Sequence, residues 1–180
     1  NLGNCWHCEK NKTNIGYASN FKNGITRVKG DIIFFSDQDD IWNSEKIRDM
    51  MEVFERNKDA SVIGTDLIHF YSNGEKKYEG NFNGTIEKVK YKKCSDFIPH
   101  PAGCTMAVKR KYILEKMDSY SSIWAHDEFF WRMATVDGCC YRIHKSYMLH
   151  RMSGTNVTSI PFKNVSDRIN QAKANMINYD

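Results

Sequence analysis

Blocks of apolar residues alternate with amphipathic segments along the chain, and this alternation predicts an α/β fold. The largely apolar run at residues 31–35 is typical of a strand buried on both faces of a mostly parallel sheet. The other predicted strands are residues 61–64, 67–70, 103–108, 140–143 and 147–150. The predicted helices are residues 14–29, 44–56, 110–117, 126–138 and 162–179.

The segment at residues 44–56 carries the clearest helix signals. Asn43 precedes it and is expected to act as its N-cap. Its apolar residues recur at helical spacing and predict one core-facing stripe, formed by Ile47, Met50, Met51 and Phe54. Residues 72–93, by contrast, are rich in Lys, Gly and Asn and indicate a surface hairpin or loop.

The composition is that of a globular protein with a mild positive charge. Hydrophobic residues make up 41% of the 180 positions, which is enough to form a core. The 26 basic and 22 acidic residues are interspersed, and this pattern argues against nucleic-acid binding. No apolar run is long enough to span a bilayer, and no signal peptide is recognisable. Because the chain opens on Asn1 without an initiator Met, we expect a segment of a longer protein.

Six cysteines are present, and without a secretory signal we expect them to be reduced in a cytosolic protein. Cys5 and Cys8 form a CxxC pair, with His7 between them. No second ligand pair follows at the spacing of a zinc finger. Free thiols are therefore the favoured interpretation over a metal knuckle.

Three carboxylates, Asp37, Asp39 and Asp40, directly follow the predicted strand at residues 31–35. Their mutual repulsion calls for a counter-charge, and the carboxyl ends of strands in α/β sheets are where ligands bind. A Mn²⁺ or Mg²⁺ ion shared with substrate phosphates would meet both conditions. The alternative is a solvated turn that caps the next helix.

These residues resemble those of a known family. Asn14-Ile15-Gly16, Asn20 and the run from Lys29 to Trp42 are similar to family 2 glycosyltransferases, in particular to the rhamnosyltransferase-like bacterial members. The resemblance implies a GT-A fold and inverting transfer from a nucleotide-diphospho-sugar. It also implies donor-binding roles for Asn14, Gly16 and Asn20. In the family's DxD motif, Asp37 resembles the ribose-side aspartate and Asp39 the metal ligand, with Asp40 alongside.

Two later segments resemble the acceptor side of the same family. Gly103, Cys104 and Thr105 are similar to the acceptor strand, and His126-Asp127-Glu128 to the start of the catalytic helix. The resemblance implies that Asp127 is the catalytic base, and this role agrees with the need of inverting transfer for a carboxylate that takes the acceptor's proton. Its alternative role is that of a helix N-cap. His126 and Glu128 are then expected to contact the acceptor.

His150 resembles a histidine that completes the metal or pyrophosphate site in the family, although a structural role stays open. His69 and His144 are given no role.

The resemblance implies a partial GT-A catalytic domain over residues 1–160, truncated at its N-terminus, and a C-terminal helix over residues 161–180. No segment before Asn14 resembles the family's first nucleotide-binding strand. We therefore expect this chain alone to bind a nucleotide sugar weakly, which calorimetry would test.

The expected function is transfer to a saccharide or lipid-linked acceptor of a bacterial surface polysaccharide or glycolipid. We expect a cytoplasmic protein and leave open a peripheral association with the inner face of the cytoplasmic membrane. Two alternatives remain. A metal-dependent nucleotidyltransferase or phosphohydrolase would need a glycine-rich or basic phosphate loop, which is not found in the sequence. A non-catalytic GT-A-like binding or assembly module is the other.

Overall fold

The computed structural model describes residues 7–91, 102–121 and 124–153. Its elements follow in the order α1 (Tyr17–Arg27), β1 (Ile32–Phe34), β2 (Ile41–Trp42), α2 (Lys46–Arg56), β3 (Val62–Tyr71), β4 (Lys76–Glu79), β5 (Ile86–Val89), the 3-10 turn η3 (Gly103–Thr105), β6 (Ala107–Lys109), α3 (Arg110–Lys116), the 3-10 turn η4 (Met117–Ser119), α4 (His126–Val136) and β7 (Cys140–Met152). Cys5, the predicted helix at 162–179 and the predicted unit 161–180 lie outside the described residues.

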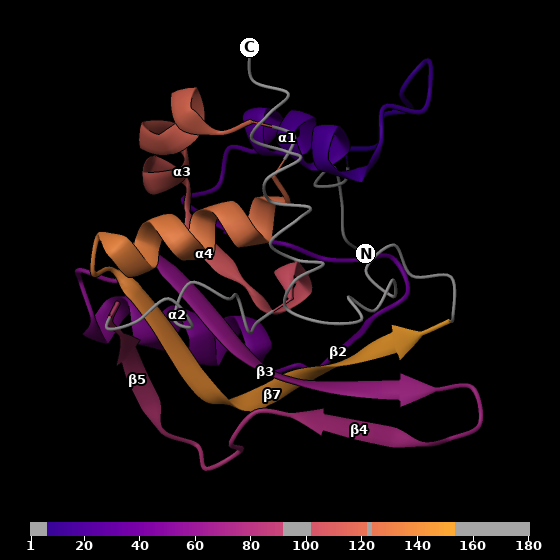
Figure 1. The fold of residues 1–180 in the computed structure, drawn as a ribbon, viewed down its shortest axis with the longest axis vertical. Helices are drawn as coiled ribbons and strands as arrows, with labels where there is room; N and C mark the ends of the chain where they lie inside the picture. The colour runs from indigo at the N-terminus through magenta and orange to yellow at the C-terminus, as the bar shows by residue number, and fades with distance from the viewer. Residues whose placement is uncertain (1–6, 92–101, 122–123, 154–180) are drawn as a thin grey trace, which may run out of the picture.

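The sheet is built on two long neighbouring strands, β3 and β7, that run parallel (Figure 1). The first half of β3 pairs with β6, which pairs in turn with β1, and the second half pairs with β4. On the other side, β7 pairs with β5 and then with β2. All of these flanking pairs are antiparallel. The sheet is therefore mixed, as the GT-A resemblance implies, but the prediction that it is mostly parallel is wrong for the described strands. The reason is that β6 runs between β1 and β3 in the opposite direction to both.

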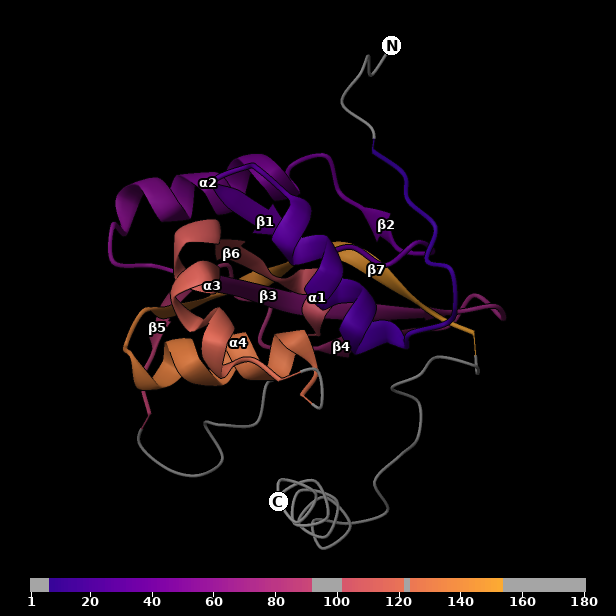
Figure 2. The same cartoon turned by 90° about the horizontal axis from the view of Figure 1, so that it is seen from above.

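Helices cover both faces of this sheet (Figure 2). One core cluster joins α1, α3 and α4 to the sheet, and the other joins α2 to the opposite face. Side chains of β1 alternate between the two: Ile33 enters the first cluster, while Ile32 and Phe34 pack against the second. The continuous apolar run of β1 therefore reflects a strand that is covered on both faces, as predicted.

Two pairs of predicted strands merge into single longer strands. Residues 62–71 form all of β3 and residues 140–152 form all of β7. The β3–β7 register shifts around Asp66, and this polar irregularity is what made the sequence pattern look interrupted.

Residues 103–105 form the 3-10 turn η3 rather than the start of a strand. The Thr105 hydroxyl donates to the Ala102 carbonyl at 2.7 Å, and the Thr105 amide donates to the same oxygen at 2.8 Å. These local bonds compete with strand pairing, so β6 begins only at Ala107.

The buried stripe of α2 differs from the expected one by one position. Met50 and Phe54 are buried as predicted, but Ile47 is 52% exposed and Lys46 is fully buried. The prediction of Asn43 as the N-cap is wrong, because α2 begins at Lys46 and Glu45 occupies the N-cap position. Asn43 instead stabilises the preceding turn, because its Oδ1 accepts from the Glu45 amide at 2.8 Å. The buried lysine belongs to the candidate site described below.

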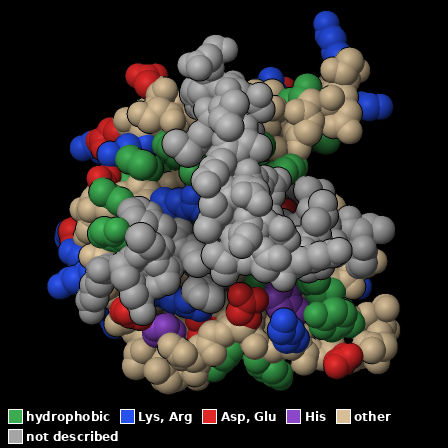
Figure 3. All heavy atoms as spheres, viewed as in Figure 1, with side chains coloured by type: hydrophobic (Ala, Val, Ile, Leu, Met, Phe, Trp, Pro, Cys, Tyr) green, Lys and Arg blue, Asp and Glu red, His purple; other side chains and the backbone are tan. Residues whose placement is uncertain are grey.

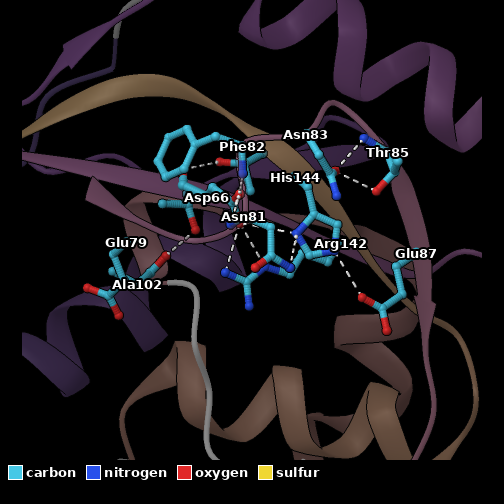
Figure 4. A network of polar contacts seen from close by, with 12 residues as sticks. Asp66, Glu79, Asn81, Phe82, Asn83, Thr85, Glu87, Ala102, Arg142 and His144 are labelled. Carbon is cyan, nitrogen blue, oxygen red and sulfur yellow. Dashed lines mark hydrogen bonds and ion pairs between the residues drawn. The ribbon is translucent and has the colours of Figure 1, made fainter.

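The loop between β4 and β5 is anchored to the central strands through Asp66 (Figure 4). This carboxylate is fully buried, pairs with Arg142 at 2.8 Å, and accepts the main-chain N–H groups of Asn81 and Phe82, both at 2.9 Å. Gly80 has a φ of 137°, and a Cβ there would overlap the Asp66 carboxyl group. The region predicted as a hairpin or loop is thus a hairpin strand, a tethered loop and a second strand.

Candidate metal and catalytic site

Four metal-ligating side chains converge where the chain leaves β1 and where β7 ends. Asp37 and Asp40 lie in the loop after β1, Cys104 lies in η3, and His150 lies on β7. One ligand atom from each of the four lies within 4.8 Å of the others. The pairing of Ile41 in β2 with Leu149 in β7 brings the acidic loop beside His150. Residues far apart in sequence thus form one compact donor set.

The two carboxylates of this group lack sufficient compensating charge. Burial raises the pKa of Asp37, and the negative charge of Asp40 raises it further. One oxygen of Asp40, Oδ2, is buried without a hydrogen-bond donor, while Oδ1 accepts from the Arg151 amide at 3.2 Å. An unsatisfied buried carboxylate oxygen beside a second carboxylate and an imidazole is a donor set that fits a divalent cation.

Asp39, the expected metal ligand of the DxD motif, is not among these four residues. Residues 38 and 39 form a turn, and the carbonyl of Asp39 accepts from Arg151 Nε at 3.2 Å. The turn places Asp40 rather than Asp39 next to Asp37. A donor-side role for the Asp39 carboxylate stays a prediction.

His150 is held by a chain of polar contacts that reaches the β3–β4 hairpin. Its Nδ1 lies 3.1 Å from Nδ1 of His69, whose Nε2 lies 2.9 Å from Oε2 of Glu79. A carboxylate only accepts, so in neutral His69 the proton sits on Nε2 and Nδ1 accepts from His150. His150 then keeps Nε2 free of a proton and available as a ligand. Hydrogen-bonded carboxylates commonly orient metal-binding histidines in this way.

A buried cation, Lys46, accompanies the acidic group. Its Nζ donates to the Cys104 carbonyl at 2.6 Å and lies 3.7 Å from the ring centroid of Trp42. Burial lowers the pKa of Lys46 to about 8, although the charges of Cys104, Asp40 and Asp37 oppose the shift. The ammonium supplies part of the counter-charge that the carboxylates need.

Cys104 is buried beneath the carboxylates as a protonated thiol. Burial raises the pKa of the thiol well above its usual range, and the negative charges of Asp40 and Asp37 raise it further. A thiol in this state is a poor nucleophile. Its sulfur nevertheless lies within 4.8 Å of a ligand atom of each of the other three residues.

Asp127, the predicted base, opens α4 next to this group. Its Oδ2 accepts the Gly103 amide at 2.9 Å, and its Oδ1 accepts the amide of Glu128 at 2.9 Å. Ala125 occupies the N-cap position, without a side-chain cap. Asp127 therefore does not cap the helix but connects α4 to η3. Its negative charge also contributes, after burial, to raising the pKa of Tyr17.

The other predicted acceptor residues are largely buried. Gly103, Cys104 and Thr105 all lie in the buried turn η3. The ring of His126 is 5% exposed and stacks on Phe21, with 3.9 Å between ring centroids. In the described part of the chain these residues pack under the site and have little surface that an acceptor could contact. Glu128 is only partly buried and pairs with Arg132 at 3.6 Å.

The three predicted donor-side residues at the start of the chain line one hollow. Asn14, Gly16 and Asn20 border an open depression of about 500 Å³, together with residues 10–13, Ile15 and Tyr17. Gly16 has a φ of 76°, and its amide donates to the Asn14 side chain at 2.9 Å. Glycine is suited to this left-handed backbone. Tyr17 also borders the hollow. Burial raises the pKa of Tyr17, and the negative charges of Asp127 and Glu128 raise it further.

Residues 3–116 match the family described as glycosyl transferase family 2. The chain belongs to glycosyl transferase family 2. It is also 28% identical over 136 residues to the dTDP-rhamnosyl transferase RfbG of Shigella flexneri, covering 70% of this chain and 44% of that protein. The chain thus spans less than half the length of this relative.

Solved structures of TarS from S. aureus share the fold. TarS 1–349 in complex with UDP-GlcNAc superposes with a TM-score of 0.59 at 15% identity, covering 87% of this chain and 44% of that one. The same protein with UDP gives 0.54 at 12% identity, covering 87% and 43%. This similarity confirms the GT-A fold of the family 2 domain.

The surface of the family 2 domain carries charges of both signs. Acidic and basic side chains are interspersed on the face in Figure 3 and do not gather by sign. Within the described residues, no helix combines the length and apolar character needed to cross a membrane.

Two residues of the site, His69 and Lys46, are not predicted from the sequence, and Cys104 is predicted on the acceptor side rather than among the metal ligands. His69 and His150 are register partners in the parallel β3–β7 pair, so only that pairing would have revealed their contact. For Lys46 a signal did exist. It lies at i, i+4 and i+8 with Met50 and Phe54.

Proposed function

We propose that this chain is the metal- and acceptor-binding part of an inverting glycosyltransferase that uses a nucleotide-diphospho-sugar. The observation that carries the proposal is the placement of Asp127 beside the group formed by Asp37, Asp40 and His150. The charge of Asp127 is close enough to contribute, after burial and the nearer charges, to the raised pKa of Asp37. In this arrangement Asp127 would serve as the base, and the neighbouring pair Asp37 and Asp40 would bind the cation.

Asp37, Asp40 and His150 would hold Mn²⁺ or Mg²⁺, with Lys46 as a neighbouring fixed cation. When bound, the ion would neutralise charge on the diphosphate leaving group. The carboxylate oxygens of Asp37 and Asp40 are donors that suit Mn²⁺ and Mg²⁺. Oδ2 of Asp40 supports this assignment, because it is a buried oxygen that accepts no hydrogen bond.

Asp127 would act as the general base. Its carboxylate would take the proton of the acceptor hydroxyl while that oxygen attacks the anomeric carbon. The diphosphate would leave from the opposite face of the sugar, so the configuration would invert. The Gly103 amide holds one carboxylate oxygen in place and so fixes the direction of attack.

The donor and acceptor classes are proposed from the relatives. The names of the two relatives include dTDP-rhamnosyl and UDP-GlcNAc, which both contain a pyrimidine nucleoside diphosphate. The hollow bordered by Asn14, Gly16 and Asn20 is the donor-side surface that we propose for such a ligand. We propose a saccharide or lipid-linked acceptor of a bacterial surface polysaccharide or glycolipid.

A donor panel tests this proposal. The full-length protein would be incubated with Mn²⁺ and individual nucleotide-diphospho-sugars, and release of nucleoside diphosphate would be measured with and without a chelator. We expect release with one donor, its loss with chelator, and its loss in Asp40→Asn. Asp118→Asn, an exposed substitution, is the matched control. Chelator-resistant release by Asp40→Asn at the wild-type rate would contradict the proposal.

A further inference from the structure

The four-residue group contains a thiol, which a site for Mg²⁺ alone does not need. Magnesium and manganese prefer oxygen ligands, whereas thiolates select softer ions such as Zn²⁺. Cys104 is 3% exposed, and its sulfur lies within 4.8 Å of ligand atoms of Asp37, Asp40 and His150. We propose that these four residues form a zinc-selective site that competes with the catalytic cation proposed above.

The donor set has the composition and spacing of a closed zinc site. Zinc takes four ligands in a tetrahedron, from thiolate, imidazole and carboxylate groups. At bond lengths of about 2.0–2.3 Å, neighbouring ligand atoms lie about 3.3–3.8 Å apart. Because all four atoms lie within 4.8 Å of one another, the group has to contract by at most about 1–1.5 Å, which is within the reach of side-chain torsions.

Two independent observations indicate a ligand at this place. The Glu79–His69–His150 chain leaves Nε2 of His150 as the nitrogen free to coordinate. Oδ2 of Asp40 is buried and accepts no hydrogen bond. A bound metal ion would pair both atoms.

Charge also balances in the zinc-bound form. On binding, the thiol of Cys104 loses its proton to solvent and the sulfur bonds to zinc as thiolate. Two carboxylates and one thiolate then face one Zn²⁺ and the ammonium of Lys46, so the buried group is neutral. Lys46 is held there by the carbonyl of Cys104 itself, at 2.6 Å.

A closed site has a functional consequence, which rests on the proposed function. Catalytic metal sites keep one position open for substrate, whereas four protein ligands fill a tetrahedral zinc. Zinc in this site would leave no position for the donor diphosphate. It would therefore inhibit the transfer that Mn²⁺ supports.

Cobalt spectroscopy on the purified, reduced chain tests the site without any enzymatic assay. Co²⁺ replaces Zn²⁺ in such sites, and a thiolate ligand gives a near-ultraviolet charge-transfer band. We expect the wild type to show this band and Cys104→Ser to lack it. In a chelator competition, the zinc affinity of Cys104→Ser should fall more than about 100-fold, because loss of a hydrogen bond to a ligand alone already costs roughly 10- to 100-fold.

Cys140→Ser is the matched control, since Cys140 is a buried thiol in the cluster beneath α4. The control is expected to keep the band. Absence of the band from the wild type overturns the proposal, even if Cys104→Ser fails to fold. Manganese-dependent transfer without the band would reject the zinc site and leave the proposed function standing. Zinc binding by the chain, together with no sugar transfer by the full-length protein, would support the zinc site and reject the proposed function.

Discussion

The buried Lys46 makes the free energy of unfolding depend on pH in a calculable way. Its ammonium is fully buried, bonded to the Cys104 carbonyl and stacked on Trp42. Burial lowers its pKa from the ordinary 10.5 of a lysine to about 8. The folded-state pKa is depressed, so above pH 8 the unfolded chain binds more protons than the folded chain. Stability therefore rises with pH through this window.

The size of the effect follows from these two values. Between pH 7 and pH 9.5, the lysine adds about 2 kcal/mol to the free energy of unfolding, at about 1.4 kcal/mol for each tenfold change in proton affinity. Lys46→Met keeps most of the apolar stem and removes the titration. From pH 7 to pH 9.5, the free energy of unfolding of the wild type should therefore rise by about 2 kcal/mol relative to that of Lys46→Met.

Urea unfolding at a series of pH values, with chelator and reductant present, measures this difference. Lys111→Met is the control, because Lys111 is exposed on α3 and should give a difference that is flat with pH. If the difference in free energy of unfolding between the wild type and Lys46→Met also stayed constant with pH, the assignment of a buried, weakly basic ammonium would be refuted.

Three further predictions concern residues around the site. Asp66→Ala should lower the free energy of unfolding by about 3–5 kcal/mol, measured by urea titration, because it leaves Arg142 buried without its partner. His69→Ala should weaken Mn²⁺ binding by roughly 10- to 100-fold in a titration followed by electron paramagnetic resonance. In the same titration Glu87→Ala, which removes the carboxylate of the separate Glu87–His144 pair, should leave Mn²⁺ affinity unchanged. Gly103→Ala should reduce transfer and leave Mn²⁺ affinity unchanged, because its Cβ would lie 2.6 Å from His126 Nε2 and 3.3 Å from Asp127 Cβ. An unchanged free energy of unfolding in Asp66→Ala, an unchanged Mn²⁺ affinity in His69→Ala, or an unchanged transfer rate in Gly103→Ala would contradict the corresponding contact.

Local patterns in the sequence predicted the local elements of this fold. The apolar run that becomes β1, the acidic residues after it, and the helical spacing from His126 onward all depend on near neighbours. The same patterns failed where the structure of a segment depends on residues that are distant in the sequence. The direction of β6 depends on its place between β1 and β3. Turn η3 is stabilised by Asp127, which lies 24 positions away along the chain.

The candidate site could be predicted only in part for the same reason. Asp37 and Asp40 lie in one loop, so their proximity was visible in the sequence. His150 is expected at the metal site only from the family resemblance, and Cys104 is not expected there, because both come from other elements and meet the carboxylates through the pairing of β2 with β7 and through η3. Lys46 was overlooked because a charged residue on a helix is expected at the surface.

The most direct test of the central claim is the transfer rate of Asp127→Asn in the full-length protein, with Mn²⁺ and the donor selected by the panel. The substitution keeps the shape of the side chain and removes the base. We expect the rate to fall by roughly 10²- to 10⁴-fold, while Mn²⁺ affinity stays at the wild-type value. Transfer at the wild-type rate would contradict the assignment of Asp127 as the base beside a metal site at Asp37, Asp40 and His150.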